Sequence, residues 1–87
     1  MADQKTTADL RKAAEITDDE IDAAVDAVLA KPETGSYPIG GGYLLDLAAA
    51  VEAFEPTRKA LADPDAKPGW RRTMARTAIL MGRPEKA

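Results

Sequence analysis

The hydrophobic residues of this chain recur every three to four positions, and this spacing predicts α-helices. The clearest stripe begins after Thr17 and ends before Pro32. Its apolar members share one helix face and are Ile21, Ala24, Val25, Val28 and Leu29. Thr17 suits the N-cap of that helix, and Glu20 stands three residues later, where a capping box requires it. No segment shows the strict alternation of polar and apolar residues that is typical of a half-buried strand.

Four more segments have helical spacing. The expected helices cover residues 8–15, 43–54, 57–62 and 70–81. Thr7 is expected to cap the first of them, and Gly82 is expected to end the last. The segment 43–54 is apolar on nearly every side, which is typical of a helix at the centre of a bundle or in an interface.

Residues 32–42 contain two prolines and four glycines, which predict one irregular loop. Tyr37 and Ile39 are its apolar members, and we expect them to fold back onto the core. The glycines at 40–42 are expected to form a flexible turn into the helix that follows. We therefore predict an all-α fold, a small bundle of four to five short helices with one Gly/Pro-rich loop.

A chain of 87 residues has room for one small domain, which we expect to span 1–87 with flexible ends at 1–6 and 83–87. Alanine occupies 18 positions and only four side chains are aromatic, so large core side chains are few. The predicted core residues are Leu10, Ile21, Val25, Leu29, Leu44, Leu47, Val51, Phe54, Leu61, Trp70, Met74 and Ala78. Such a core leaves a thin margin of stability, which a partner or a second copy could increase.

The charges are sorted along the chain, although the net charge is only −3. Residues 1–66 carry a net charge of −8, and residues 67–87 carry a net charge of +5. Arg72 and Arg76 are four positions apart and share one face of the last predicted helix. Three interpretations stay open: this helix lies against the acidic second helix of the same chain, it meets the acidic end of another protein or copy, or it binds phosphates.

The composition excludes several kinds of catalytic and metal site. The chain has no His and no Cys, so it offers no imidazole base, no thiol nucleophile and no usual zinc ligand set. Asp18, Asp22 and Asp26 are predicted to line a helix, whereas the ligands of a calcium loop lie on an irregular segment. We therefore predict no enzyme activity, no cofactor, and no catalytic, cofactor-binding or metal-binding residues.

These observations favour a small acidic helical protein that binds another protein or associates with itself. It would be an adaptor, an inhibitor or a small structural component of a larger bacterial or phage assembly. The residues predicted to face the partner are Tyr37, Ile39, Tyr43, Arg72 and Arg76. The alternative is a nucleic-acid-associated protein that uses the basic C-terminal helix, or an acidic mimic of nucleic acid that uses residues 15–26.

The expected location is the cytoplasm, without membrane contact. No stretch approaches the roughly 20 apolar residues of a membrane span. The first ten residues also lack the apolar core of a signal peptide.

Overall fold

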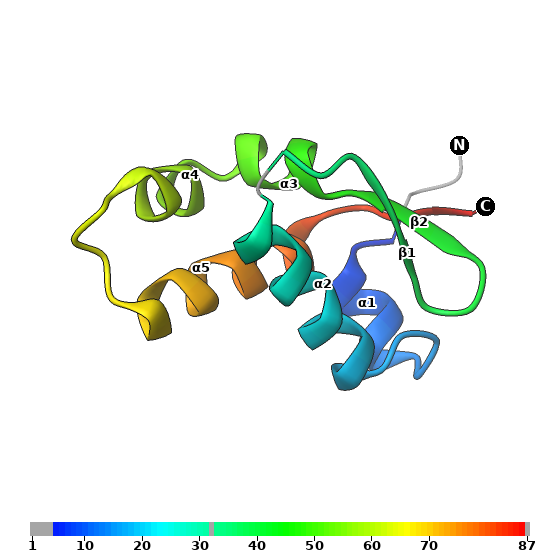
Figure 1. The fold of residues 1–87 in the computed structure, drawn as a ribbon. Coiled ribbons are helices and arrows are strands. Elements are labelled where there is room, and N and C mark those ends of the chain that lie inside the picture. The colour runs from blue at the N-terminus through cyan, green and yellow to red at the C-terminus, as the bar shows by residue number, and fades with distance from the viewer. Residues whose placement is uncertain (1–4, 32, 87) are drawn as a thin grey trace.

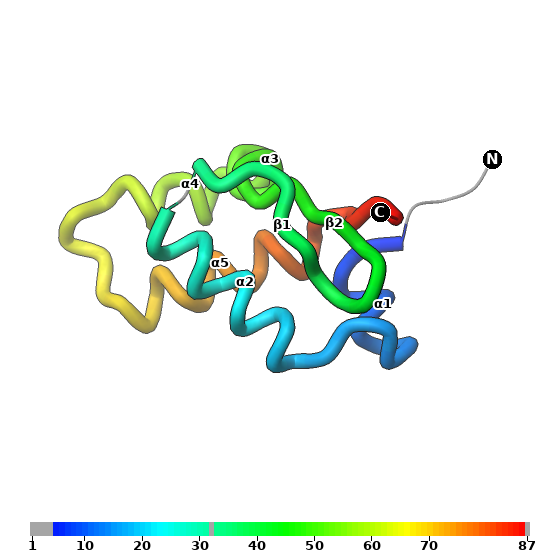
Figure 2. The backbone as a smooth tube through the Cα atoms, turned by 45° about the vertical axis from the view of Figure 1, so that its right-hand side comes forward, coloured from blue at the N-terminus to red at the C-terminus, as the bar shows by residue number. Residues whose placement is uncertain are grey.

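The computed structural model describes residues 5–31 and 33–86 (Figure 1). Its elements are, in chain order, α1 (Thr7–Lys12), α2 (Asp18–Ala30), β1 (Ser36–Ile39), β2 (Tyr43–Asp46), α3 (Leu47–Ala53), α4 (Glu55–Ala62), α5 (Pro68–Met81) and β3 (Glu85–Lys86). Helices α2 and α5 pack side by side in the middle of an elongated molecule. Figure 2 shows the β1–β2 hairpin and α1 at one end, and the α4–α5 connection at the other.

The predicted all-α fold is wrong, because the described residues also form a three-stranded antiparallel sheet in the order β1-β2-β3. The stretch 32–42, predicted to be irregular, contains β1, and residues 43–46, predicted to begin a helix, form β2. The two strands flank three glycines, and Gly40 takes the positive φ of 70° that the turn requires. Helix α3 begins only at Leu47, where the Asp46 carboxylate accepts a hydrogen bond from the Ala49 amide at 3.0 Å.

The register of the sheet decides which side chains face the core. Opposite residues of an antiparallel pair point to the same face, and successive residues point to opposite faces. The inner face therefore carries Tyr37, Ile39, Tyr43 and Leu45, which are buried or half-buried. Leu44 lies on the outer face, opposite Pro38 of β1 and Glu85 of β3.

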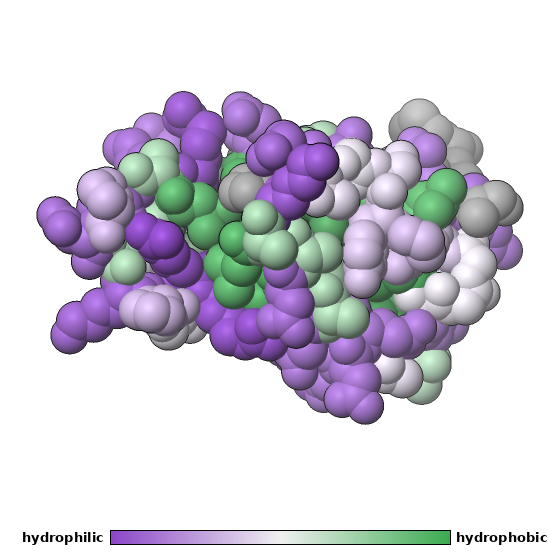
Figure 3. Space-filling model, viewed as in Figure 1, coloured by the Kyte–Doolittle hydropathy of each residue, from purple (hydrophilic) through white to green (hydrophobic). Residues whose placement is uncertain are grey.

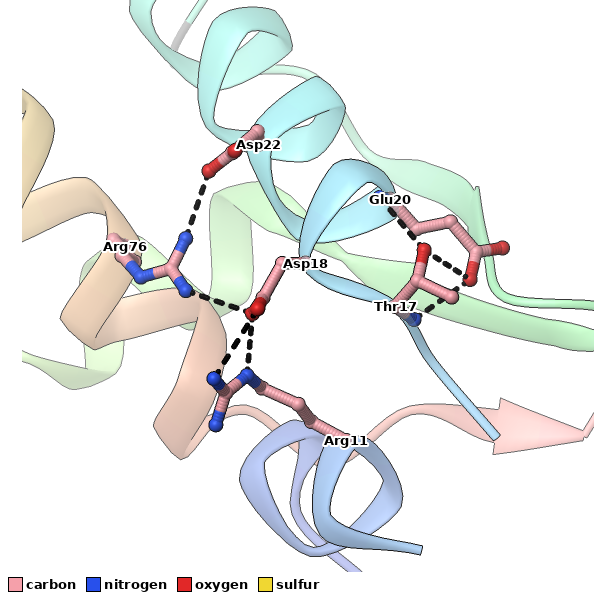
Figure 4. Close-up of polar contacts among 6 residues, drawn as sticks. All are labelled: Arg11, Thr17, Asp18, Glu20, Asp22 and Arg76. Atoms are coloured by element: carbon pink, nitrogen blue, oxygen red, sulfur yellow. Dashed lines mark hydrogen bonds and ion pairs between the residues drawn. The ribbon is translucent and has the colours of Figure 1, made fainter. Parts of the chain in front are cut away.

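Local capping signals place the starts of the first two helices. At α2, the Thr17 amide donates to Glu20 Oε1 at 2.8 Å, and the Glu20 amide donates to Thr17 Oγ1 at 3.2 Å (Figure 4). This confirms the predicted capping box. At α1 the cap is Thr6 rather than Thr7, because Asp9 completes a capping box with Thr6. Thr7 is buried instead, and its amide donates to the Gly82 carbonyl at 2.8 Å, which ties α1 to the end of α5.

The residues that form the core differ in part from those predicted. The predicted residues that are buried are Leu10, Ile21, Val25, Leu47, Val51 and Ala78. Those that are partly buried are Leu29, Phe54, Leu61 and Met74. Leu44 is 37% exposed and Trp70 is 54% exposed, so both assignments were wrong. Trp70 lies in the first turn of α5, whose buried face holds Ala75, Ala78 and Ile79.

Candidate functional site

A row of ion pairs joins α2 to α5 (Figure 4). Arg76 contacts Asp22 through Nη1 at 2.8 Å and Asp18 through Nη2 at 3.1 Å. Arg72 Nη1 lies 2.6 Å from Asp26 Oδ1. The carboxylates are four positions apart on α2 and the arginines are four apart on α5, so each series follows one helix face. The basic helix therefore lies against the acidic helix of the same chain, as the first of the three interpretations holds.

Asp18 is the most heavily engaged carboxylate of this row. The guanidinium groups of Arg11 and Arg76 both bind it, and the pair with Arg11 is bidentate. Hydrogen bonding from Arg11 lowers the pKa of Asp18 below its ordinary value of 3.8, and Arg76 adds to the effect against partial desolvation. The same contact raises the pKa of Arg11, and the bond to Asp26 raises that of Arg72.

The lowered pKa of Asp18 predicts how its contribution to stability varies with pH. A carboxyl group whose folded pKa lies below its unfolded value stabilises the fold above the unfolded pKa, and this contribution is lost as the pH falls through the folded pKa. We expect Asp18→Asn to lower the urea midpoint at neutral pH, and we expect this difference from the parent to shrink as the pH falls below 3.8 through the lowered pKa of Asp18. Asp19→Asn is the control, because Asp19 makes no ion pair with a residue the structure describes. Equal effects of the two variants would contradict this role of Asp18.

The five residues predicted to face a partner fall into two groups. Arg72 and Arg76 bind the α2 carboxylates. Tyr37 packs against the core and Ile39 is 1% exposed, so Ile39 has no surface to offer a partner in this fold. The Tyr43 hydroxyl donates to Glu15 Oε1 at 3.2 Å. Partial burial and this hydrogen bond raise the pKa of Tyr43.

A different surface shows the features of a binding site. Three large hydrophobic side chains are exposed among the residues the structure describes: Leu44, Trp70 and Met81. Two of them, Leu44 and Met81, line the same groove of about 590 Å³. Met81 is 56% exposed. The groove lies between β2, α3 and the segment that joins α5 to β3. Exposed apolar side chains are ordinary when scattered singly, whereas apolar side chains gathered in one concave surface are typical of interaction sites.

Three features of the chain build this groove. Strand alternation directs Leu44 to the outer face of the sheet. Ala49 and Ala53 of α3 line the groove and are exposed, so this wall has only methyl side chains. At Gly82 an added Cβ would lie 2.9 Å from Leu45 Cδ1 and 3.2 Å from the Ile79 carbonyl oxygen. The absence of a side chain at Gly82 therefore allows the chain to leave α5 close against the sheet.

The rim of the groove is charged. It carries Asp46 and Glu85 as acidic residues and Arg83 as the basic one, and all three are exposed. The Asp46 carboxylate caps α3, whereas no ion pair joins Arg83 or Glu85 to another residue in 5–31 or 33–86. An apolar floor with a polar rim is the usual anatomy of a protein–protein interface.

A smaller hollow of about 240 Å³ lies where α2, α4 and the start of α5 meet. Its lining includes Leu29, Leu61 and Arg71, and Figure 3 shows apolar side chains reaching the surface between α2 and α4. Both leucines are partly buried against the core, so this hollow offers less free apolar surface than the groove.

The groove was not predicted, because Leu44 was assigned to the core of a helical bundle and residues 43–54 were expected to form one helix. Two signals could have found the strand that carries Leu44. Apolar segments on both sides of three glycines are typical of a hairpin, and Asp46 directly before an alanine-rich run is typical of an N-cap.

The chain matches no protein-family model, no curated protein and no solved structure. Among the helices of the described residues, none is both long enough and apolar enough to cross a membrane. Residues 5–31 and 33–86 contain no group of three or more acidic side chains placed to hold a metal ion.

Proposed function

We propose that this chain is a non-catalytic protein-binding module and that the groove between β2, α3 and the end of α5 is its binding surface. The observation that carries the proposal is that Leu44 and Met81 line one groove, and they are two of the three exposed large hydrophobic side chains in the described part of the chain. Covering them would remove apolar surface from water, which is favourable by about 25 cal/mol for each Å² of apolar surface buried. The charged rim would fix the orientation of the bound protein. Such a module would act as an adaptor, an inhibitor or a small component of a larger assembly.

The ion pairs between α2 and α5 favour this function over nucleic-acid binding. Arg72 and Arg76 would have to leave Asp18, Asp22 and Asp26 before they could contact phosphates. The same pairs engage Asp18, Asp22 and Asp26, which are half of the six carboxylates in residues 15–26 that a mimic of nucleic acid would present. The absence of His and Cys supports a non-catalytic role. A chain without Cys needs no oxidising compartment to fold, which agrees with the cytoplasmic location that we propose.

The proposal is tested by capture of proteins from the native host with three immobilised forms of the chain. These are the parent, the double variant Leu44→Ser/Met81→Ser, and Trp70→Ser as a matched loss of exposed apolar surface outside the groove. We expect the parent and Trp70→Ser to retain the same protein, and the double variant to retain it about tenfold less. Thermal melts of all three forms check that the fold is intact.

Two results would contradict the proposal. One is that the double variant retains every protein that the parent retains. The other is that Trp70→Ser loses the same protein to the same degree, because the apolar groove would then not be the surface that binds.

A further inference from the structure

We infer that the occupant of the groove is a second copy of this chain, bound face to face around a two-fold axis. This inference rests on the proposed function, because it uses the same groove. In a two-fold contact each copy presents the same patch, so the patch must be complementary to itself. The edges of the sheet, the shape of the groove and the charges on its rim each support such a contact.

The edges of the sheet oppose the addition of another strand. β1 is one edge, and Pro38 within it has no N–H to donate. Pro38 is opposite Leu44 in the register, and because proline has no N–H this pair is one that exchanges no hydrogen bonds. The backbone nitrogen of Pro38 therefore faces outward, where another strand would need a donor. The other edge, β3, has only two residues and directly follows Pro84. Proline and short strands are how proteins protect sheet edges, so a second copy would bind on the outer face of the sheet instead.

The shape of the groove combines a projection with a recess. Met81 is more than half exposed at the end of α5, and its side chain is long and flexible. Ala49 and Ala53 form a wall without projecting side chains. A two-fold axis would place Met81 of each copy against the alanines of the other. Leu44 of both copies would then be covered in the same contact.

The rim is complementary to itself in charge. Among the described residues that line the groove, Arg83 is the one cation, and Asp46 and Glu85 are the two anions. In the two-fold arrangement each Arg83 faces the acidic rim of the other copy, so the pairing occurs twice. Neither Arg83 nor Glu85 has an ion-pair partner within the described part of its own chain, so both are free to pair between copies.

The test uses the purified chain, with its mass measured by light scattering and by sedimentation over a range of concentrations. We expect the parent to form a dimer. Arg83→Glu and Glu85→Arg should each weaken the dimer about tenfold or more, because each places like charges together twice. An equimolar mixture of the two variants should restore it, since both contacts then join opposite charges. The chain that carries both substitutions should also dimerise.

Lys86→Glu is the matched control for charge. Lys86 is exposed, lies next to Glu85 and is opposite Tyr43, so it points to the other face of the sheet. This variant changes the net charge as much as Arg83→Glu does, and we expect it to leave the dimer unchanged. A loss equal to that of Arg83→Glu would overturn the assignment of the contact to the groove rim.

The results also separate this inference from the proposed function. A monomeric parent overturns the inference, while groove-dependent capture of a different protein from the host would leave the proposed function standing. A dimer that persists in Leu44→Ser/Met81→Ser uses another surface and overturns the inference as well. A monomer that captures nothing through the groove contradicts both.

Discussion

Replacing Leu47 with alanine is expected to lower the free energy of unfolding by about 2–5 kcal/mol. Leu47 is 0% exposed and belongs to the main hydrophobic cluster, although it is the first residue of α3. Its removal would leave a cavity beneath the helix that forms one wall of the groove. Because small domains are stable by about 5–15 kcal/mol in total, this loss is a large fraction. Urea unfolding followed by circular dichroism at 222 nm measures it.

Leu44→Ala is the matched control, since it removes the same atoms from a leucine three positions earlier. Leu44 is exposed in the groove, so we expect its loss to lower the free energy of unfolding by less than about 1 kcal/mol. The two variants differ in burial rather than in chemistry. Equal losses would contradict the assignment of Leu47 to the core and of Leu44 to the surface.

The contrast between these two leucines shows what the sequence could not determine. Leu47 and Val51 lie three and seven positions after Leu44, and this spacing fits one face of a helix. The same residues also fit a strand followed by a helix, with Tyr43 and Leu45 facing inward before the cap at Asp46. A strand of four residues is too short for its pattern to decide between the two. Pairing with β1 and β3 decides it, and β3 lies about forty residues away in the sequence.

Features determined by a few neighbouring residues were predictable. The Thr17–Glu20 capping box is an example, because both partners lie within one turn of α2. The ion pairs of Arg72 and Arg76 were only one of three interpretations, because they require that α5 packs on α2. The groove was not predictable, since β2, α3 and the end of α5 form it together. The close approach of Gly82 to Leu45 likewise exists only once these elements pack.

The hairpin that carries Leu44 depends on a glycine, and Gly40→Ala is expected to lower the free energy of unfolding by about 1–3 kcal/mol. Gly40 has a φ of +70°, a conformation that side chains disfavour. An added Cβ would also lie 2.8 Å from Ile16 Cγ1 and 3.0 Å from the Glu15 carbonyl oxygen. Ile16 is in the core, and the second contact is with backbone, so neither neighbour can move aside at little cost.

Gly41→Ala is the control for this substitution, and thermal or urea unfolding compares the two. Gly41 has no positive φ, and an added Cβ there would meet nothing within 4 Å. We expect its stability to equal that of the parent or to exceed it by up to about 1 kcal/mol, because alanine restricts the unfolded chain. Gly40→Ala should also weaken self-association, since the hairpin that it strains places Leu44 in the groove. Equal stability of the two variants would contradict this role of Gly40, because the close packing of Gly40 against Glu15 and Ile16 would then not fix the position of the hairpin.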